Sequence, residues 1–137
     1  MSPNILITEV DRRRLGALIT ESFQLNALER RYLSELEQEL AGARTIDSSE
    51  VPPDVVTMNS TVELSDLDTG ETTNYTLVYP READVLNNRI SVLAPAGTAI
   101  LGYRVGDVVR YPAPKGMVRL RIDNLLYQPE RVGDFGR

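Results

Sequence analysis

The sequence contains neither cysteine nor histidine. The lack of cysteine excludes disulfide bonds, thiolate metal sites and thiol nucleophiles. The lack of histidine removes the commonest general base and the commonest ligand for transition metals. A zinc site and a Ser-His-Asp catalytic triad are therefore excluded. Only carboxylates, lysine, tyrosine or a carboxylate-held Mg²⁺ remain as possible catalytic groups. We expect a protein that is not an enzyme and that needs no cofactor.

Long apolar runs and an excess of positive charge are also missing. No run approaches the roughly 18–20 apolar residues that span a bilayer, and the N-terminus lacks the features of a signal peptide. The net charge of −5 argues against sequence-specific nucleic acid binding as the main role. With 137 residues, the chain suits one compact domain or a small domain with an appendage. We expect a cytoplasmic protein that does not associate with membranes.

Residues 1–46 predict a hairpin of two amphipathic helices. Thr8 and Asp11 have the spacing of a capping box at the start of the first helix. Asn26 can cap a second helix of about 17 residues, which would be about 25 Å long. Apolar residues of that helix step by 3, 4 and 3, like a coiled-coil seam: Leu33, Leu36, Leu40 and Ala43. Two such helices with a short link should form a short antiparallel coiled coil.

A polar segment with two prolines, residues 47–53, predicts a linker between this hairpin and a second domain at 54–137. The period then changes from helical to alternating, and the residues from Val56 to Leu64 predict a strand. A turn at 66–70, further short strands and one short helix beginning at Pro95 follow: strands near 75–79, 90–93, 108–111 and 118–122. The pattern predicts an α+β protein with an antiparallel sheet and a loose tail from residue 129.

The acidic motifs are weak candidates for chemistry. Asp68-Thr69-Gly70 matches the aspartic protease tripeptide, but such enzymes need two of them, so a hairpin turn is favoured. The same turn begins like a calcium loop but lacks the required later acid. Four further acids could hold Mg²⁺ only if the fold gathered them, and solvated loop charge is the favoured interpretation: Asp47, Glu50, Glu82 and Asp84.

Two segments favour a contact with a partner. The basic run at 12–14 is too short for a nucleic-acid patch, and we expect a solvated helix face, paired with the glutamates Glu35, Glu37 and Glu39. The strip at 90–97 places small and apolar residues where a loop meets a helix. It forms either core and a tight connection or a small exposed apolar patch for a protein partner.

The second half resembles the C-terminal domain of the Gre transcript-cleavage factors. The matching motifs occur in the order of that family: Thr69-Gly-Glu71, Tyr75-Thr-Leu-Val78, Glu82-Ala-Asp84, Ile90-Ser91, Ala94-Pro95, Ala99-Ile-Leu-Gly102 and Val105-Gly-Asp107. Over most of the chain the sequence is more similar to the Rnk family, short Gre relatives called regulators of nucleoside diphosphate kinase. Motifs that carry this resemblance include Pro53-Asp-Val-Val-Thr-Met-Asn-Ser60, Thr76-Leu-Val-Tyr-Pro80 and Ser91-Val-Leu-Ala-Pro95.

The resemblance implies an FKBP-like C-terminal domain that docks at the secondary channel of RNA polymerase, preceded by a coiled coil. In Gre factors two acids at the coiled-coil tip help to hold a catalytic Mg²⁺. Here the corresponding tip, with Glu21, Phe23 and Gln24, carries one acid, and the hairpin is short. At the docking loop, Gre factors commonly carry an acid and a serine before the proline, where this chain has Leu93 and Ala94 followed by Pro95 and Ala96.

These departures imply a regulator that binds RNA polymerase, competes with Gre factors and does not stimulate cleavage. Contact would run through the apolar loop of Leu93, Ala94, Pro95 and Ala96, and we expect a monomer. The Rnk name implies an effect on nucleoside diphosphate kinase levels, which we expect to be indirect. Two alternatives stay open: a prolyl isomerase, by analogy with FKBP proteins, and a residual cleavage factor that uses Glu21. Membership of this family would also be compatible with DNA binding as a general property of the family.

Overall fold

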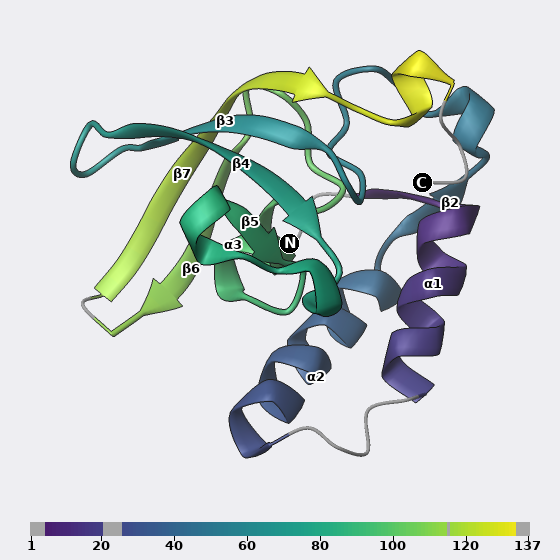
Figure 1. Cartoon of the computed structure of the whole chain (residues 1–137), viewed down its shortest axis with the longest axis horizontal. Helices are drawn as coiled ribbons and strands as arrows, with labels where there is room; N and C mark the ends of the chain where they lie inside the picture. Colours follow the sequence, from purple (N-terminus) through teal and green to yellow (C-terminus); the bar gives the residue numbers. More distant parts are fainter. Residues whose placement is uncertain (1–4, 21–25, 115, 134–137) are drawn as a thin grey trace.

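The computed structural model describes residues 5–20, 26–114 and 116–133. Its N-terminal part contains two helices and two short strands: β1 (Leu6–Thr8), α1 (Glu9–Thr20), α2 (Ala27–Ala41) and β2 (Arg44–Ile46). β1 and β2 pair in parallel, so the chain leaves the helices beside the point where it entered them (Figure 1). The helices were predicted, whereas the two strands were not. Each strand has only three residues, too few to show a period in the sequence.

Both predicted helix starts are confirmed. The Thr8 side-chain oxygen Oγ1 accepts a hydrogen bond from the backbone N–H of Asp11 at 3.0 Å. Asn26 Oδ1 likewise accepts from the N–H of Glu29 at 2.8 Å. Because a short polar side chain at this position satisfies an otherwise unpaired N–H group, each residue fixes where its helix begins. α2 is 15 residues long, slightly shorter than expected, and spans roughly 22 Å.

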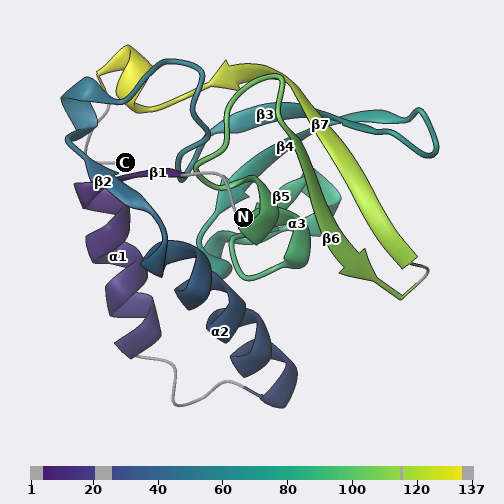
Figure 2. The same cartoon turned by 180° about the vertical axis from the view of Figure 1, so that it is seen from behind.

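The predicted coiled coil is not confirmed. α1 and α2 run in opposite directions and spread apart away from β1 and β2, as Figures 1 and 2 both show. The leucines of the expected seam, Leu33, Leu36 and Leu40, are buried in the same apolar cluster as Val62 of the sheet and Ile100 of the third helix. The helical part and the sheet therefore share a core. The division into separate units at residues 47–53 stays a prediction.

A curled five-stranded sheet forms the second half, with the strand order β5-β4-β3-β7-β6. Its members are β3 (Thr61–Asp66), β4 (Thr72–Val78), β5 (Arg89–Ser91), β6 (Val108–Ala113) and β7 (Gly116–Tyr127). The expectation of a purely antiparallel sheet is wrong, because β5 pairs in parallel with β4. Parallel neighbours need a crossover, and the segment 79–88 supplies one through two 3₁₀ turns, η3 (Pro80–Glu82) and η4 (Val85–Asn87).

The strand expected from Val56 begins only at Thr61. Asn59 adopts a left-handed conformation with φ of 67°, and the Ser60 N–H bonds the Thr57 carbonyl oxygen, so the chain turns before it pairs. The predicted buried face is nevertheless correct, because all of its members are buried: Val56, Met58, Ser60, Val62 and Leu64. The turn at 66–70 joins β3 to β4 as predicted, with Gly70 at φ of 78°.

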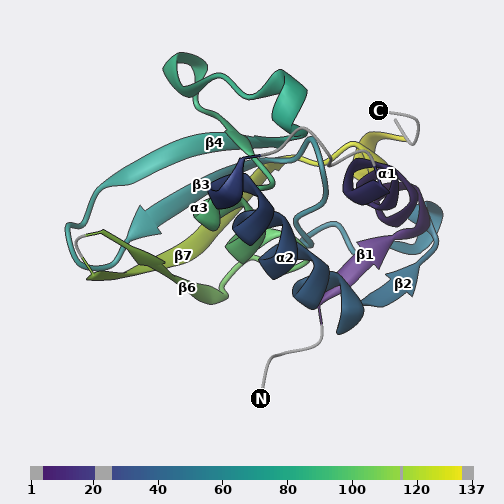
Figure 3. The ribbon, with the colours of Figure 1, turned by 90° about the horizontal axis from the view of Figure 1, so that it is seen from below.

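The predicted short helix is α3 (Pro95–Ile100), with proline at its start and Gly102 just beyond its end at φ of 83°. α3 lies next to β6, and α2 crosses in front of it when the molecule is seen from below (Figures 2 and 3). A Cβ at Gly102 would lie 2.8 Å from the Cβ of Ile5. Glycine is therefore required where the N-terminal segment meets the end of α3.

The tail from residue 129 was expected to be loose, but its described part is anchored where it begins. Pro129 is buried, and η5 (Glu130–Val132) forms one helical turn. The Glu130 carboxylate accepts a hydrogen bond of 2.6 Å from the Thr57 hydroxyl, and the buried Gln128 donates to two backbone carbonyl groups of the segment 52–55. The bond to Pro52 links the end of the sheet domain to the segment that was predicted to be a linker, and the other two bonds reach Val55 and Thr57 just after it. Among the described residues, no helix is long and apolar enough to cross a membrane.

Candidate functional site

The loop before α3 is held rigidly by its own backbone and by two side chains. Ser91 accepts two hydrogen bonds of 3.0 Å, from the Leu93 N–H to its Oγ and from the Ala94 N–H to its carbonyl oxygen. The Thr98 hydroxyl donates to the Val92 carbonyl oxygen at 2.6 Å. A Cβ at Gly97 would lie only 2.2 Å from the Ser91 carbonyl oxygen, so α3 touches the strand end directly. The loop is a preformed surface rather than a hinge.

The four residues predicted to contact a partner do not all lie on that surface. Leu93 is only 5 % exposed and belongs to the core cluster. Ala94, Pro95 and Ala96 are half-buried, so part of each side chain is accessible. Of the two interpretations of this strip, core packing therefore applies to Leu93, whereas a small accessible apolar surface remains at the next three positions.

A cavity of about 420 Å³ opens beside this loop, between α2, α3 and β6. Pro95, Tyr32 and Tyr111 supply apolar surface, and Glu35, Glu39 and Arg110 supply charge. Glu35 also lies 4.0 Å from Arg31 in an exposed ion pair, which contributes little to stability. Pro95 belongs both to the loop and to the lining of this cavity, so the two surfaces meet at that residue. Such a surface suits contact with a protein better than binding of a deeply enclosed ligand.

The predicted coiled-coil tip lies outside the described residues. Glu21, Phe23 and Gln24 are all in the segment 21–25, so their positions carry no argument about a metal site. Among the described residues, no three acidic side chains are grouped so that they could hold a metal ion.

The other acidic candidates have local partners. Asp66 Oδ1 accepts from the N–H groups of Asp68 and Thr69, so the protease-like tripeptide forms a turn. Asp68 also pairs with Arg119 at 2.7 Å.

The four acids considered for Mg²⁺ either have local partners or are exposed. Asp47 accepts from Ser49, which holds the pKa of Asp47 below its usual range. Glu82 lies near Arg89, Asp84 accepts from Asn87, and Glu50 is exposed.

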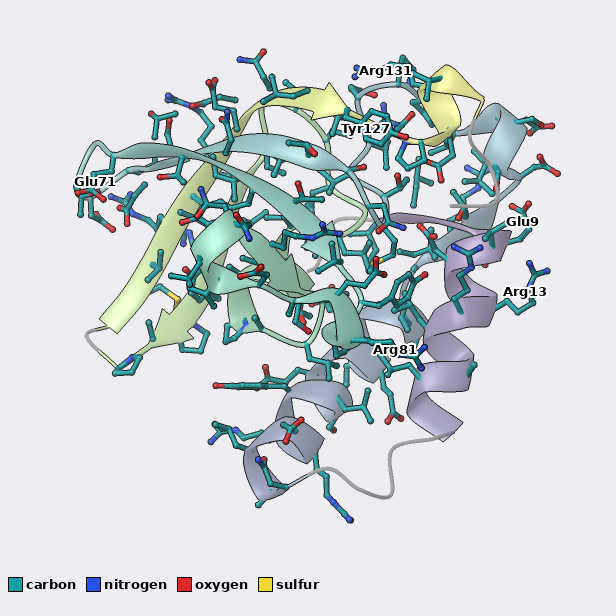
Figure 4. All side chains as sticks on the ribbon, viewed as in Figure 1. Glu9, Arg13, Glu71, Arg81, Tyr127 and Arg131 are labelled. Atoms are coloured by element: carbon teal, nitrogen blue, oxygen red, sulfur yellow. The ribbon has the colours of Figure 1, made fainter. Side chains whose placement is uncertain are left out.

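The basic run on α1 is not simply a solvated face. Arg12 Nη2 donates to the carbonyl oxygens of Leu40 and Ala43, at 3.1 and 3.0 Å. The Leu40 carbonyl lies in the last turn of α2 and that of Ala43 just beyond the end of the helix, and the Leu40 oxygen also accepts from the Ala43 N–H at 3.1 Å. Arg12 thus joins α1 to the end of α2, whereas Arg13 points outward from α1 (Figure 4). Arg12 therefore bonds to backbone carbonyl groups at the end of α2, and not to the glutamates of α2 as expected.

A buried carboxyl group at Asp11 was missed by sequence reasoning. Asp11 is only 2 % exposed, and its Oδ2 accepts a hydrogen bond of 3.0 Å from the backbone N–H of Met58. Burial raises its pKa to about 7, and the nearby Glu130 adds to this shift, while the bond from Met58 opposes it. The capping-box spacing gave a local role for Asp11, so nothing indicated its contact with residue 58, which is distant in the sequence.

Two family models together match most of the chain. The C-terminal model of the transcription elongation factors GreA and GreB matches residues 51–127, and the Rnk N-terminus model matches residues 3–45. The regulator of nucleoside diphosphate kinase from Escherichia coli strain K12 is 38 % identical over 134 residues, which cover 97 % of this chain and 96 % of that protein. The chain belongs to the Rnk family of GreA/GreB-related proteins. The predicted resemblance is thereby confirmed.

Gre factors themselves are similar over a smaller part. Transcription elongation factor GreA of Chloroherpeton thalassium is 41 % identical over 93 residues, 68 % of this Rnk family member but only 59 % of the elongation factor. A solved structure described as a transcription elongation factor GreA/GreB from Nitrosomonas europaea is 39 % identical, with a TM-score of 0.72. It covers 92 % of this chain and all of its own chain. The α+β fold is therefore that of GreA/GreB-type structures, and these relatives are named as regulators or elongation factors rather than catalysts.

Proposed function

We propose that this protein binds RNA polymerase near its secondary channel, competes there with Gre factors and does not stimulate transcript cleavage. The observation that carries the proposal is the combination of a Gre-type C-terminal half with a very short pair of helices, α1 and α2, which we call the helical arm. The C-terminal match covers residues 51–127, whereas α2 is only 15 residues long. A factor with this composition keeps the part that docks in Gre factors and lacks the length that reaches the polymerase active site.

The arm also lacks the chemistry for cleavage. Its tip sequence contains one acid, Glu21, where Gre factors carry two. Mg²⁺ prefers near-octahedral oxygen ligands, and a single carboxylate from the arm would give a weaker and less defined site. At roughly 22 Å, α2 would fall short of an active site that a much longer Gre hairpin reaches. Both features favour occupancy of the channel entrance without catalysis.

The docking surface in this proposal is the loop at Ala94, Pro95 and Ala96 together with the adjoining cavity of about 420 Å³. The loop is rigid, so binding would cost little conformational entropy. Its accessible atoms are apolar, and the contact would therefore depend less on charge than in Gre factors with an acid at this place. Leu93 is buried beneath this loop, and we propose that it supports the loop rather than forming the contact.

Competition of this kind works by mass action. A monomer that occupies the channel entrance lowers the fraction of polymerase available to longer factors, in proportion to its concentration over its dissociation constant. Changes in nucleoside diphosphate kinase levels would then be an indirect, transcriptional consequence. If RNA polymerase is the partner, the protein works where the polymerase does, in the cytoplasm.

The test is a binding measurement with two variants at one position. Ala94 is the residue before the first turn of α3 and offers no side-chain cap. Ala94→Ser can supply that cap, should stabilise the fold by about 1 kcal/mol, and should leave binding of core polymerase intact. Ala94→Arg places a long charge on the apolar loop and should weaken binding. If wild type fails to bind core polymerase at micromolar concentration, or if both variants bind like wild type, the proposed docking is wrong.

A further inference from the structure

A second cavity lies toward the tip of the β3–β4 hairpin, on the face of the sheet that buries the core. Its volume is about 190 Å³, and Leu64 and Leu120, both members of the core cluster, line it. Ala96 of the docking loop lines it as well. Tyr111 borders both this cavity and the one of about 420 Å³, so the smaller cavity adjoins the proposed docking surface.

The lining of this cavity changes from apolar to acidic along β3 and β4. Every second residue of a strand points to the same face, and directly paired residues share that face. From the core toward the hairpin tip, the pairs on the inner face are Val62 with Tyr75, Leu64 with Thr73, and Asp66 with Glu71. The last pair is joined by a backbone hydrogen bond of 2.8 Å. The face that buries the core therefore ends in two carboxylates.

No cation within the cavity neutralises these carboxylates. Among the described residues that line it, none is basic. Asp66 Oδ1 accepts from the N–H groups of Asp68 and Thr69, which fixes the carboxylate and leaves Oδ2 outside these bonds. Arg119 is close to Asp66, but it is bonded to Asp68 at 2.7 Å and, as the neighbour of Leu120, belongs to the opposite face of the sheet. The cavity thus carries negative charge that can attract a cation.

Two tyrosines border the same space. Tyr75 belongs to β4 and Tyr111 to β6, and β3 and β7 lie between these strands, so the curl of the sheet brings both tyrosines to one cavity. Burial raises the pKa of Tyr111, and the nearby Tyr75 and Asp66 add to the shift, so the hydroxyl keeps its proton. The face of a tyrosine ring attracts a cation. The rings and the carboxylates therefore favour the same charge.

The size of the cavity limits what can enter it. Small-molecule sites usually enclose about 300–1,000 Å³, so a cavity of about 190 Å³ suits one side chain better than a separate ligand. Lysine and arginine carry a charged head on an apolar stem. The stem matches the apolar lining by Leu64, Ile90 and Leu120, and the head matches Asp66 and Glu71. Glu71 lies at the tip of the hairpin (Figure 4), where a side chain from outside can reach it.

We propose that this cavity binds a lysine or arginine side chain of the protein that docks on the loop at Ala94, Pro95 and Ala96. The inference rests on the proposed docking to RNA polymerase, and it specifies the polymerase segment as one that presents a basic side chain beside apolar ones. The stem lies along the apolar lining, and the head lies between Asp66 and Glu71. The loop itself has no charged side chain, so the cavity supplies the electrostatic complementarity of the contact.

The test compares binding of core RNA polymerase by wild type and by the double variant Asp66→Asn/Glu71→Gln, at about 0.1 M and about 0.5 M salt. Asparagine keeps an oxygen for the turn, and Glu71 is exposed, so the fold should be retained. At the lower salt concentration the double variant should bind about five- to tenfold more weakly, and the difference should shrink at the higher one, because salt screens exposed charges. Glu37→Gln/Glu50→Gln is the matched control, since it removes two exposed charges outside both cavities, and it should bind like wild type.

The outcomes separate this inference from the docking itself. If wild type binds polymerase and Ala94→Arg weakens binding, but the double variant binds like wild type at both salt concentrations, the docking stands and the basic side chain is refuted. Equal losses in the double variant and in the control would also overturn the inference, because they indicate a general effect of net charge. If wild type does not bind polymerase, the docking and the inference both fail. If the double variant does not fold, Glu71→Lys changes one exposed side chain only and should weaken binding at least as much.

Discussion

Replacement of the buried Asp11 tests the energetics of the contact between α1 and the loop at Met58. In the native protein, burial and the neighbouring Glu130 raise the pKa of Asp11 to about 7 from the ordinary value of 3.8. The native state therefore holds a proton between these values that the unfolded chain has released. Because the unfolded state binds fewer protons there, stability falls as the pH rises.

The size of the effect follows from the shift. A change from 3.8 to about 7 is roughly 3 units, and each unit corresponds to about 1.4 kcal/mol. The shift therefore contributes at most roughly 4 kcal/mol to the free energy of unfolding. This contribution is fully present below pH 3.8 and is lost as the pH rises through about 7. Asp11→Asn keeps an oxygen that can accept from the Met58 N–H but cannot ionise, so it should not show this loss.

The assay is urea unfolding of wild type and Asp11→Asn at pH 5 and pH 8, followed by circular dichroism. The free energy of unfolding of the variant should rise relative to wild type by about 2–3 kcal/mol between these two pH values, because only about 2 units of the shift lie between pH 5 and the folded pKa of about 7. Glu37→Gln, an exposed acid on the outer face of α2, is the control and should follow wild type at both pH values. Parallel pH profiles of wild type and Asp11→Asn would refute the reasoning.

Three further substitutions test other contacts, each by urea unfolding. Gly97→Ala places a Cβ 2.2 Å from the carbonyl oxygen of Ser91, so it should cost several kcal/mol and loosen the docking loop; a neutral change would contradict this close approach. Gln128→Ala leaves two carbonyl groups of the segment 52–55 without their donors and should cost about 2–3 kcal/mol, whereas a loss below 0.5 kcal/mol would show that water replaces the amide. Arg12→Ala removes the donor to the end of α2 and should cost about 1 kcal/mol, with Arg13→Ala unchanged in comparison.

The elements with strong local signals were predictable from the sequence. Thr8 and Asn26 mark helix starts because their side chains satisfy backbone N–H groups within the same turn. Pro95 and Gly102 bound α3 for equally local reasons. The alternating apolar residues after residue 55 predicted the buried face even where the chain turns before the strand begins, since burial and strand pairing are separate properties.

The missed features depend on contacts between distant residues. The parallel pairing of β5 depends on how the crossover at 79–88 returns to the sheet, which no local pattern encodes. The seam of α2 looks like a coiled coil because a helix that packs on a sheet and one that packs on a helix bury similar stripes. Arg12 and Asp11 find partners about 30 and 47 residues away. A cavity of about 270 Å³ likewise joins residues from both ends of the chain, Arg14 and Tyr127.

A competition assay tests the central claim most directly. Backtracked RNA polymerase complexes receive a Gre factor at a fixed level, and this protein is then titrated while transcript cleavage is followed. We predict that cleavage falls as the protein concentration rises, that the protein alone stimulates no cleavage, and that Ala94→Arg competes more weakly than wild type. Unchanged cleavage at a saturating concentration, or cleavage stimulated by the protein itself, would contradict the account.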